Sequence, residues 1–216
     1  MYVLKIIKPA VKFINKPDWE KAIKQIELCG RTCYKSEHRI TDNSAKVFIK
    51  NLIKRGHEAV LEHFSFTVRF TCDRGVTHQI VRHRLSSFCQ ESTRYCQYSD
   101  DKFDNQISVI KPCFFEPGDN FYELWKQSCE QSEKAYFDLL EKGAKPEEAR
   151  SVLPNSLKTE LVMTTNIREW RHFLKLRSSA AAHPQIRELA YMLLVLCDYE
   201  NNVLFQDIQP SVDTKK

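Results

Sequence analysis

Glycine is scarce in this chain, with 5 glycines among 216 residues. Neither the G-x-G-x-x-G pattern nor G-K-[ST] occurs, so neither a Rossmann loop nor a P-loop is predicted. Any bound nucleotide must then be held mainly by side chains. Long apolar runs are also missing: no stretch reaches the length that spans a bilayer, and the N-terminus lacks the apolar core of a signal peptide. These absences predict a cytoplasmic protein with no membrane partner.

The cysteines show no pattern of pairing or metal ligation. Eight are scattered along the chain, and no C-x-x-C motif occurs. Without a secretion signal, free thiols are expected. The net charge of +5 is modest, and lysine and arginine alternate with acidic residues rather than forming a basic stripe. We therefore expect neither a nucleic-acid partner nor a metal site.

The hydrophobic periodicity predicts a mixed α/β (α+β) fold, with one domain over residues 1–216 and a central sheet flanked by helices. The expected strands cover 3–8, 64–71, 106–111 and 157–165. The expected helices cover 18–31, 43–55, 73–81, 120–142, 146–150, 167–177 and 186–201. The long helix over 120–142 is predicted to turn six apolar residues inward: Phe121, Leu124, Trp125, Ala135, Leu139 and Leu140. Residues 85–99 show no clean period, and we interpret them as a functional loop.

The most informative stretch is RHRLSSFCQESTRY, residues 82–95. Three cationic or potentially cationic side chains in succession repel one another unless an anion lies among them. In a turn or extended conformation, Arg82 and Arg84 share one side and His83 takes the other. Arginine binds phosphate through paired hydrogen bonds, so the triplet is typical of a nucleotide clamp. An isolated RHR would more simply be a solvated basic turn, but here a hydroxyl, an amide and Arg94 follow closely.

Arg82-His83-Arg84, then seven residues, then Ser92 resembles the signature of flavin-dependent thymidylate synthases. The resemblance continues upstream through Gly56-His57-Glu58 and Leu61-Glu62-His63. Downstream it includes Glu148-Ala149-Arg150 with Leu153-Pro154, and the block from Asn166 to Phe173 with Leu176-Arg177. It implies reductive methylation of dUMP to dTMP, with FAD, NADPH and 5,10-methylenetetrahydrofolate. It also implies a homotetramer with shared active sites.

The resemblance also implies roles for individual residues. Those expected to meet FAD are Ala59, Arg82, His83, Arg84, Gln90, Asn166, Ile167, Arg168 and His172. Those expected to meet dUMP are Gln79, Ile80, Val81, Arg82, Gln90, Glu91, Ser92, Thr93, Arg94, Arg150 and Arg177. Arg177 is the expected catalytic residue, because a fixed cation beside the uracil ring favours its N3-deprotonated form.

The chain departs from the family pattern at three positions. Ala59 stands where a Ser or Thr often follows His-Glu in the family. A backbone contact with FAD would survive this change, and a hydroxyl contact would not. Cys89 and Gln90 stand where Asn and Glu occur in other members. Cys89 and Cys96 are alternative nucleophiles near cationic residues, although the resemblance suggests that no enzymic thiol attacks the pyrimidine.

Helical spacing sorts the residues of segment 167–177 into two faces. Arg168 and His172 stand at i and i+4 and share one face. Trp170, Phe173, Leu174 and Arg177 form a second stripe, in which the apolar residues belong to the core and Arg177 projects at its edge. Arg171 is expected to face solvent or form a structural ion pair.

Two other classes of protein compete with this interpretation. A metal-dependent nucleotide-processing enzyme would use the histidines at 57, 63, 78 and 83, but His78 and His83 are about 140° apart on a helix, and no pair has zinc-finger spacing. A nucleic-acid-binding module would stack bases on Phe88, Tyr95 and Tyr98, but the balancing acidic residues argue against it.

Overall fold

The computed structural model describes residues 4–100 and 103–211. The strands are β1 (Lys5–Ile7), β2 (Ala10–Phe13), β3 (Ser65–Asp73), β4 (Ser87–Gln90), β5 (Ser108–Ile110) and β6 (Lys158–Asn166). The α-helices are α1 (Trp19–Thr32), α2 (Ser44–Lys54), α3 (Arg74–Ile80), α4 (Asn120–Glu141), α5 (Pro146–Ala149), α6 (Ile167–Arg177) and α7 (Pro184–Leu196). The 3-10 helices are η1 (Glu37–Arg39), η2 (Glu58–His63) and η4 (Arg150–Val152). The predicted mixed α+β class is confirmed.

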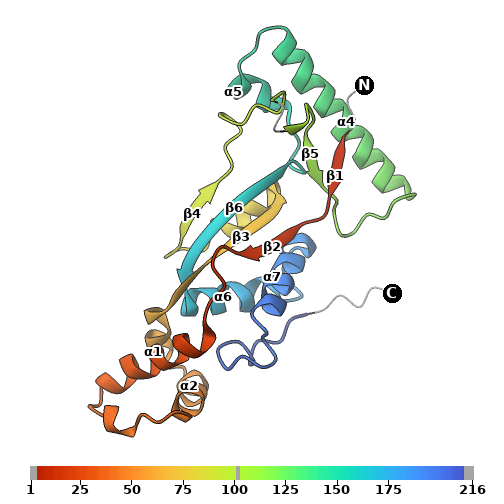
Figure 1. Ribbon diagram of the computed structural model, residues 1–216. Helices are drawn as coiled ribbons and strands as arrows, with labels where there is room; N and C mark the ends of the chain where they lie inside the picture. The colour runs from red at the N-terminus through yellow and green to blue at the C-terminus, as the bar shows by residue number, and fades with distance from the viewer. Residues whose placement is uncertain (1–3, 101–102, 212–216) are drawn as a thin grey trace. The chain divides into compact units, whose positions relative to one another are not determined.

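The strands form two sheets instead of one. β1 and β5 pair in parallel, with Ile6 opposite Val109 (Figure 1). The other sheet has the strand order β2-β3-β6-β4. β3 and β6 alternate buried and partly exposed residues along their length, which is the period that predicted them. The predicted strand over 3–8 is confirmed for Lys5–Ile7, and Val3 lies outside the described residues.

Within the described residues the chain separates into two compact units. The first comprises the segment ending at Ala10, Phe70–Arg82 and Cys89–Leu161. The second comprises Val11–Arg69, His83–Phe88 and the segment from Val162 onward. Both units are discontinuous in sequence, so no single cut of the chain separates them. One domain over residues 1–216 stays a prediction.

The first unit is built on α4 and the β1–β5 pair. Asp119 caps α4 by accepting a hydrogen bond from the Tyr122 N–H, and Gly143 follows the helix with a φ of +92°. The face of α4 that is buried carries Cys129, Glu133, Tyr136 and Phe137. These side chains belong to a core that also includes Ile107, Val109 and Leu157.

The predicted inward residues at the start of α4 are wrong. Phe121 is 70% exposed and Leu124 is 66% exposed. The buried face runs through Cys129, and the five residues from Leu124 to Cys129 correspond to about 140° of rotation. The apolar pattern at the start of the helix is therefore out of phase with the face that packs. Trp125, Ala135, Leu139 and Leu140 are partly buried, as their intermediate exposure shows.

The second unit is built around α6. Trp170, Phe173 and Leu174 are fully buried, and the Trp170 ring stacks on Phe66 of β3 with centroids 4.9 Å apart. The Trp170 indole N–H also donates to the Phe66 carbonyl at 3.2 Å. The apolar stripe predicted for residues 167–177 is therefore confirmed as core. α6 also packs against α7 and η2.

Two further expectations need correction. Residues 85–99 were expected to lack regular structure, but Ser87–Gln90 form β4. Its partner is β6, more than sixty residues away, and a short polar strand shows no local period that would reveal such pairing. The final helix, expected to reach residue 201, ends at Leu196 because the chain then turns through Asp198, whose φ is +50°.

No helix among the described residues is both long enough and apolar enough to cross a membrane.

Candidate functional site

The residues predicted to meet dUMP lie largely in the first unit. Asp73 begins α3 by accepting a hydrogen bond from the Val76 N–H at 2.7 Å. Gln79, Ile80 and Val81 follow at the end of this helix, and the Ile80 side chain is fully buried. Any contact of Ile80 with a ligand would therefore have to use its backbone.

A cluster of polar side chains follows β4 in the same unit. The Arg150 guanidinium donates to the Thr93 hydroxyl at 3.3 Å, which joins two segments that are 57 residues apart. Thr93 is 5% exposed, whereas Arg94 and Arg150 are exposed. Ser92 accepts a hydrogen bond from the Arg94 N–H at 3.3 Å. Two arginines and two hydroxyls, from the segment after β4 and from η4, make a set of donors suited to an anion such as a phosphate.

Gln90 and Glu91, which lie in the same segment, are held by the protein itself. The Gln90 amide donates to the hydroxyls of Thr77 at 3.2 Å and Thr159 at 3.4 Å. The Glu91 carboxylate accepts from the Tyr98 hydroxyl at 3.3 Å and pairs with Lys158 at 2.8 Å. Burial, with the charge of Glu91, raises the pKa of Tyr98 well above its usual range, so Tyr98 remains a donor.

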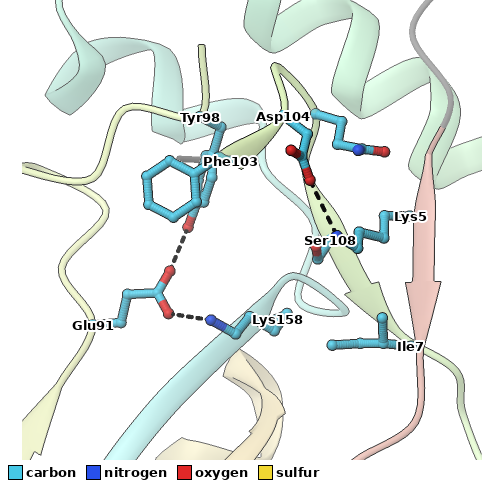
Figure 2. A pocket seen from close by; sticks show the side chains of 9 residues that line it. Lys5, Ile7, Glu91, Tyr98, Phe103, Asp104, Ser108 and Lys158 are labelled. Carbon is cyan, nitrogen blue, oxygen red and sulfur yellow. Dashed lines mark hydrogen bonds and ion pairs between the residues drawn. The ribbon is translucent and has the colours of Figure 1, made fainter. Parts of the chain in front are cut away.

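Glu91 borders a cavity of about 290 Å³ in the first unit. Figure 2 shows its carboxylate between Tyr98 and Lys158, and the ion pair of Lys5 with Asp104 elsewhere on the wall. Both carboxylates in this wall are therefore paired with a lysine. The charges in the cavity wall are therefore balanced. The Glu91 carboxylate already has two partners there, Tyr98 and Lys158.

The residues predicted to meet FAD lie largely in the second unit. A cavity of about 470 Å³ there is lined by Glu58, Glu62, Leu85, Asn166, Arg168, Glu169 and His172. Arg168 and His172 thus share one face of α6, as their i, i+4 spacing predicted. Asn166, Arg168 and His172 were singled out from the sequence, and Ala59 lies beside Glu58 in η2.

Residues at the start of α6 also have structural partners. Asn166 caps the helix by accepting a hydrogen bond from the Glu169 N–H at 3.0 Å. Arg168 pairs with Glu62 at 2.6 Å. Ile167 is fully buried, and its N–H donates to the Phe64 carbonyl at 2.9 Å. Any ligand in this cavity would therefore contact the N-terminus of α6, whose residues are held in place by these interactions.

The Arg82-His83-Arg84 triplet divides as predicted for a turn. Arg82 and Arg84 are exposed, and His83 is 3% exposed. Neither arginine makes a hydrogen bond or ion pair with any described residue. Leu85, the next residue, is 84% exposed with a φ of +63°, and its carbonyl accepts a hydrogen bond from the Thr165 hydroxyl. A non-glycine residue in this backbone region costs on the order of 1–3 kcal/mol and is often found at ligand sites.

His83 connects the triplet to α6. Its Nδ1 lies 3.1 Å from Glu169 Oε1, and its Nε2 lies 3.1 Å from Arg177 Nε. The ring packs edge-on against Phe173, with centroids 4.9 Å apart. Burial, reinforced by the charges of Arg177 and His172, lowers the pKa of His83 to about 4. His83 is therefore neutral at physiological pH.

Sequence reasoning missed four residues that line this cavity: Glu58, Glu62, Leu85 and Glu169. Helical spacing could have found Glu169, because it stands three residues before His172 and shares its face. Glu62 lies within a matching block but received no role. Arg171, for which solvent or a structural pair was expected, is fully buried and pairs with Asp207 at 2.7 Å and Glu58 at 3.2 Å. The structural pair is the correct alternative.

The cavity of the second unit suits part of a flavin dinucleotide. Its volume lies in the range of small-molecule sites. Leu85 provides an apolar wall, and Arg168 and His172 provide donors. Its three carboxylates all have partners: Glu58 pairs with Arg171, Glu62 pairs with Arg168, and Glu169 accepts a hydrogen bond from the neutral His83.

Two residues of this cavity, Glu169 and His172, lie near His83 in a group of side chains with metal-binding atoms. One ligand atom each of His83, Glu169 and His172 lies within 4.8 Å of the others. The guanidinium of Arg177 contacts His83 at 3.1 Å, and this fixed positive charge disfavours a cation at the cluster.

Comparisons with known proteins bear on the whole chain. The family model described as "Thymidylate synthase complementing protein" matches residues 17–199. The flavin-dependent thymidylate synthase of Pyrococcus furiosus is 32% identical over 192 residues, which cover 88% of this chain and 76% of that protein. The one from Geobacter sulfurreducens is 32% identical over 203 residues, covering 91% of this chain and 84% of that protein.

A solved structure shares the fold. The UMP/dUMP methylase PolB from Streptomyces cacaoi, bound with 5-Br dUMP, superposes with a TM-score of 0.73 at 23% identity. The superposition covers 94% of this chain and 95% of the other. The family match and the relatives that are more than 30% identical show that the chain belongs to the flavin-dependent thymidylate synthase family.

Proposed function

We propose that this protein methylates dUMP to dTMP, with 5,10-methylenetetrahydrofolate as carbon donor and NADPH as the source of reducing equivalents through FAD. The observation that carries the proposal is the presence of two donor clusters at the positions where the family signature predicts nucleotide contacts. One joins Thr93 to Arg150, and the other joins His83 to Arg177.

The dUMP phosphate is proposed to bind at Ser92, Thr93, Arg94 and Arg150. An arginine held by a neighbouring hydroxyl, as Arg150 is by Thr93, is preoriented for charge-assisted hydrogen bonds to phosphate oxygens. The proposed contacts at the end of α3 are Gln79, Ile80, Val81 and Arg82. Gln90 and Glu91 complete the proposed set.

Arg177 is the proposed catalytic residue. Its guanidinium would stand beside the uracil ring and stabilise the N3-deprotonated pyrimidine by Coulomb attraction in a water-poor pocket. Burial lowers the pKa of Arg177 below its ordinary value, but an arginine remains charged at neutral pH. A permanent cation is therefore available without any change of protonation.

The flavin is proposed to lie against Ala59, Arg82, Arg84, Asn166, Ile167, Arg168 and His172, with Gln90 near it. When bound, FAD supplies the redox chemistry, and the protein supplies binding, orientation and charge. The carbon donor becomes tetrahydrofolate as the methyl group forms at C5 of the pyrimidine.

We further propose a cytoplasmic homotetramer in which neighbouring chains complete each site. A cavity of about 470 Å³ accommodates only part of a dinucleotide as large as FAD, which is the physical reason to expect a second chain. Light scattering at working concentration tests this directly, and a monomer that turns over at the full rate would contradict it.

The direct test of function is anaerobic turnover. Purified protein supplied with dUMP, 5,10-methylenetetrahydrofolate, FAD and NADPH should form dTMP. Arg177→Ala should weaken dUMP binding and turnover far more than FAD binding. Absence of dTMP from flavin-loaded protein would refute the activity, and an Arg177→Ala variant with full turnover would remove the proposed role of this residue.

A further inference from the structure

His83 is part of a chain of three polar side chains in the second unit. Glu169 Oε1 lies 3.1 Å from His83 Nδ1, and His83 Nε2 lies 3.1 Å from Arg177 Nε. Glu169 and Arg177 come from the beginning and end of α6, and His83 from the turn after α3. Both ring nitrogens of His83 are therefore used inside the protein.

The direction of each hydrogen bond follows from the chemistry of arginine. The Nε of a guanidinium carries a hydrogen and can only donate. His83 Nε2 must therefore accept, which leaves the single proton of the neutral imidazole on Nδ1. That N–H donates to the Glu169 carboxylate. One tautomer alone satisfies both contacts, and Glu169 selects it.

Burial supports the same protonation state. His83 is 3% exposed, and its ring lies against Phe173 at 4.9 Å and His172 at 5.5 Å. A protonated ring would turn an N–H toward the Arg177 N–H and set two cations together. The lowered pKa of His83 agrees with this geometry. A ring so enclosed has little surface left for direct contact with a ligand.

We propose that Glu169 and His83 are positioning residues that orient the Arg177 guanidinium toward the pyrimidine of dUMP. The contact with His83 uses Nε of Arg177, so it fixes the plane and direction of the guanidinium. This inference rests on the proposed function, in which Arg177 faces the uracil ring. It assigns Glu169 a role that helical spacing alone does not reveal, because its partner His83 lies 86 residues away in the sequence.

The competing interpretation of the cluster is a metal site formed by His83, Glu169 and His172. A metal on His83 Nδ1 would replace the hydrogen bond to Glu169. It would also bring a second positive charge close to Arg177. Orientation of Arg177 accounts for both ring nitrogens, whereas a metal accounts for one.

Glu169→Gln is the first test, made on the FAD-loaded enzyme. A glutamine amide can donate to Nδ1 and so permit the tautomer that cannot accept from Arg177. We expect turnover of dUMP to fall about 10- to 100-fold, as when the partner that orients a functional histidine is lost. Glu169 also lines the cavity proposed for flavin, so FAD affinity is followed by flavin fluorescence and turnover is compared at saturating FAD. Glu20→Gln, on the exposed start of α1, is the matched control and should behave as wild type.

A double-mutant cycle separates positioning from general structural support. If Glu169 acts only through Arg177, Glu169→Gln should change turnover of an Arg177→Ala enzyme by less than about two-fold. Independent losses that multiply in the double variant would overturn the proposal. So would a Glu169→Gln enzyme with wild-type turnover while Arg177→Ala is impaired, and that result would leave the proposed function intact. Full turnover by Arg177→Ala would instead refute the proposed role of Arg177, and the orientation proposal with it.

Two measurements do not depend on activity. Nitrogen-15 NMR of the ring, assigned by comparison with His83→Gln, should show a protonated Nδ1 and an unprotonated Nε2 near pH 7. The opposite tautomer would overturn the proposal. Titration of the wild-type protein with Zn²⁺ tests the competing interpretation, and stoichiometric binding that Glu169→Gln abolishes would favour the metal site.

Discussion

The burial of neutral His83 makes a prediction about acid stability. Its pKa is lowered from 6.5 to about 4 in the folded protein. Between these values the unfolded chain binds the proton and the folded chain does not. The contribution of neutral His83 to the free energy of unfolding is therefore complete above pH 6.5 and is lost as the pH falls toward 4. The groups facing the ring are Glu169, Arg177 and His172. The loss amounts to roughly 3 kcal/mol.

Unfolding by urea between pH 7.5 and 4 provides the measurement. The free energy of unfolding of wild type should fall more steeply than that of His83→Gln, whose side chain does not titrate. The difference in free energy of unfolding between the two proteins should change mainly between pH 6.5 and 4. Above pH 6.5 it should stay constant. Parallel pH dependences would show that His83 is not buried as a neutral ring.

Arg150 makes a prediction about the phosphate of the substrate. Arg150→Ala removes a guanidinium that Thr93 holds in place. A charge-assisted hydrogen bond contributes about 1.5–3 kcal/mol, so the KM for dUMP should rise roughly 10- to 100-fold. Inhibition by deoxyuridine, which has no phosphate, should change little. Arg39→Ala in η1 is the control, and an equal loss for both ligands would place Arg150 away from the phosphate.

The start of α6 makes a prediction that separates a helix cap from a ligand contact. Asn166 accepts a hydrogen bond from the Glu169 N–H and also lines the cavity proposed for flavin. Asn166→Asp keeps the acceptor and favours the helix dipole, so stability should be retained. The same change removes an N–H₂ donor and adds a negative charge in the cavity, so FAD affinity should fall. Asn166→Ala should lose about 1 kcal/mol of stability as well.

Thermal unfolding and flavin fluorescence read these two effects separately. If Asn166→Asp binds FAD as tightly as wild type, Asn166 acts only as the cap.

The other face of α6 is fixed by the buried guanidinium of Arg171. It bonds both carboxylate oxygens of Asp207 at 2.7 Å, as well as Glu58 and the Leu204 carbonyl. Burial alone would raise the pKa of Asp207, but the hydrogen bonds and charge of Arg171 hold it below its ordinary value. This network ties the segment after α7 to α6 and η2.

Asp207→Asn should destabilise the protein at pH 7 by about 1–3 kcal/mol, because Arg171 would lose its paired acceptor. A lowered carboxyl pKa stabilises the fold above the unfolded value near 3.8, and this stability is lost as the pH falls through the folded value. The difference in free energy of unfolding between variant and wild type, measured with urea, should therefore close below about pH 4. Asp42→Asn, on an exposed turn, is the control. A gap that persists in acid would contradict the ion pair as its source.

At the scale of elements, the sequence predicted best where one face of a helix or strand is buried. The core stripe of α6 followed from a local pattern, because helical spacing is a property of neighbouring residues. β4 was missed because its pairing partner is far away in the chain. Glu169 was missed as a site residue because its partner, His83, lies 86 residues away in the sequence.

At the scale of the whole molecule, the outcome for α4 connects fold and assembly. Phe121 and Leu124 were predicted to face inward, yet they are 70% and 66% exposed. The Phe121 ring stacks on Phe115 at 6.0 Å, and Phe115 contacts Phe114, which is 43% exposed. A contiguous apolar patch of this kind is typical of an interaction surface. The proposed homotetramer would supply a second chain to cover it.

The prediction is that Phe121→Ser/Leu124→Ser weakens assembly without unfolding the chain. Exposed side chains contribute little to the stability of a single chain, whereas burial at an interface stabilises it by about 25 cal/mol per Å² of apolar surface. Light scattering over a concentration series should show wild type as a tetramer and the double variant dissociating at concentrations where wild type does not. Val47→Ser, an exposed apolar change on α2, is the matched control. A double variant that remains tetrameric at every concentration would place the interface elsewhere. If it dissociates and also loses FAD, neighbouring chains complete the flavin site, whereas dissociation with FAD retained would mean that each chain binds it alone.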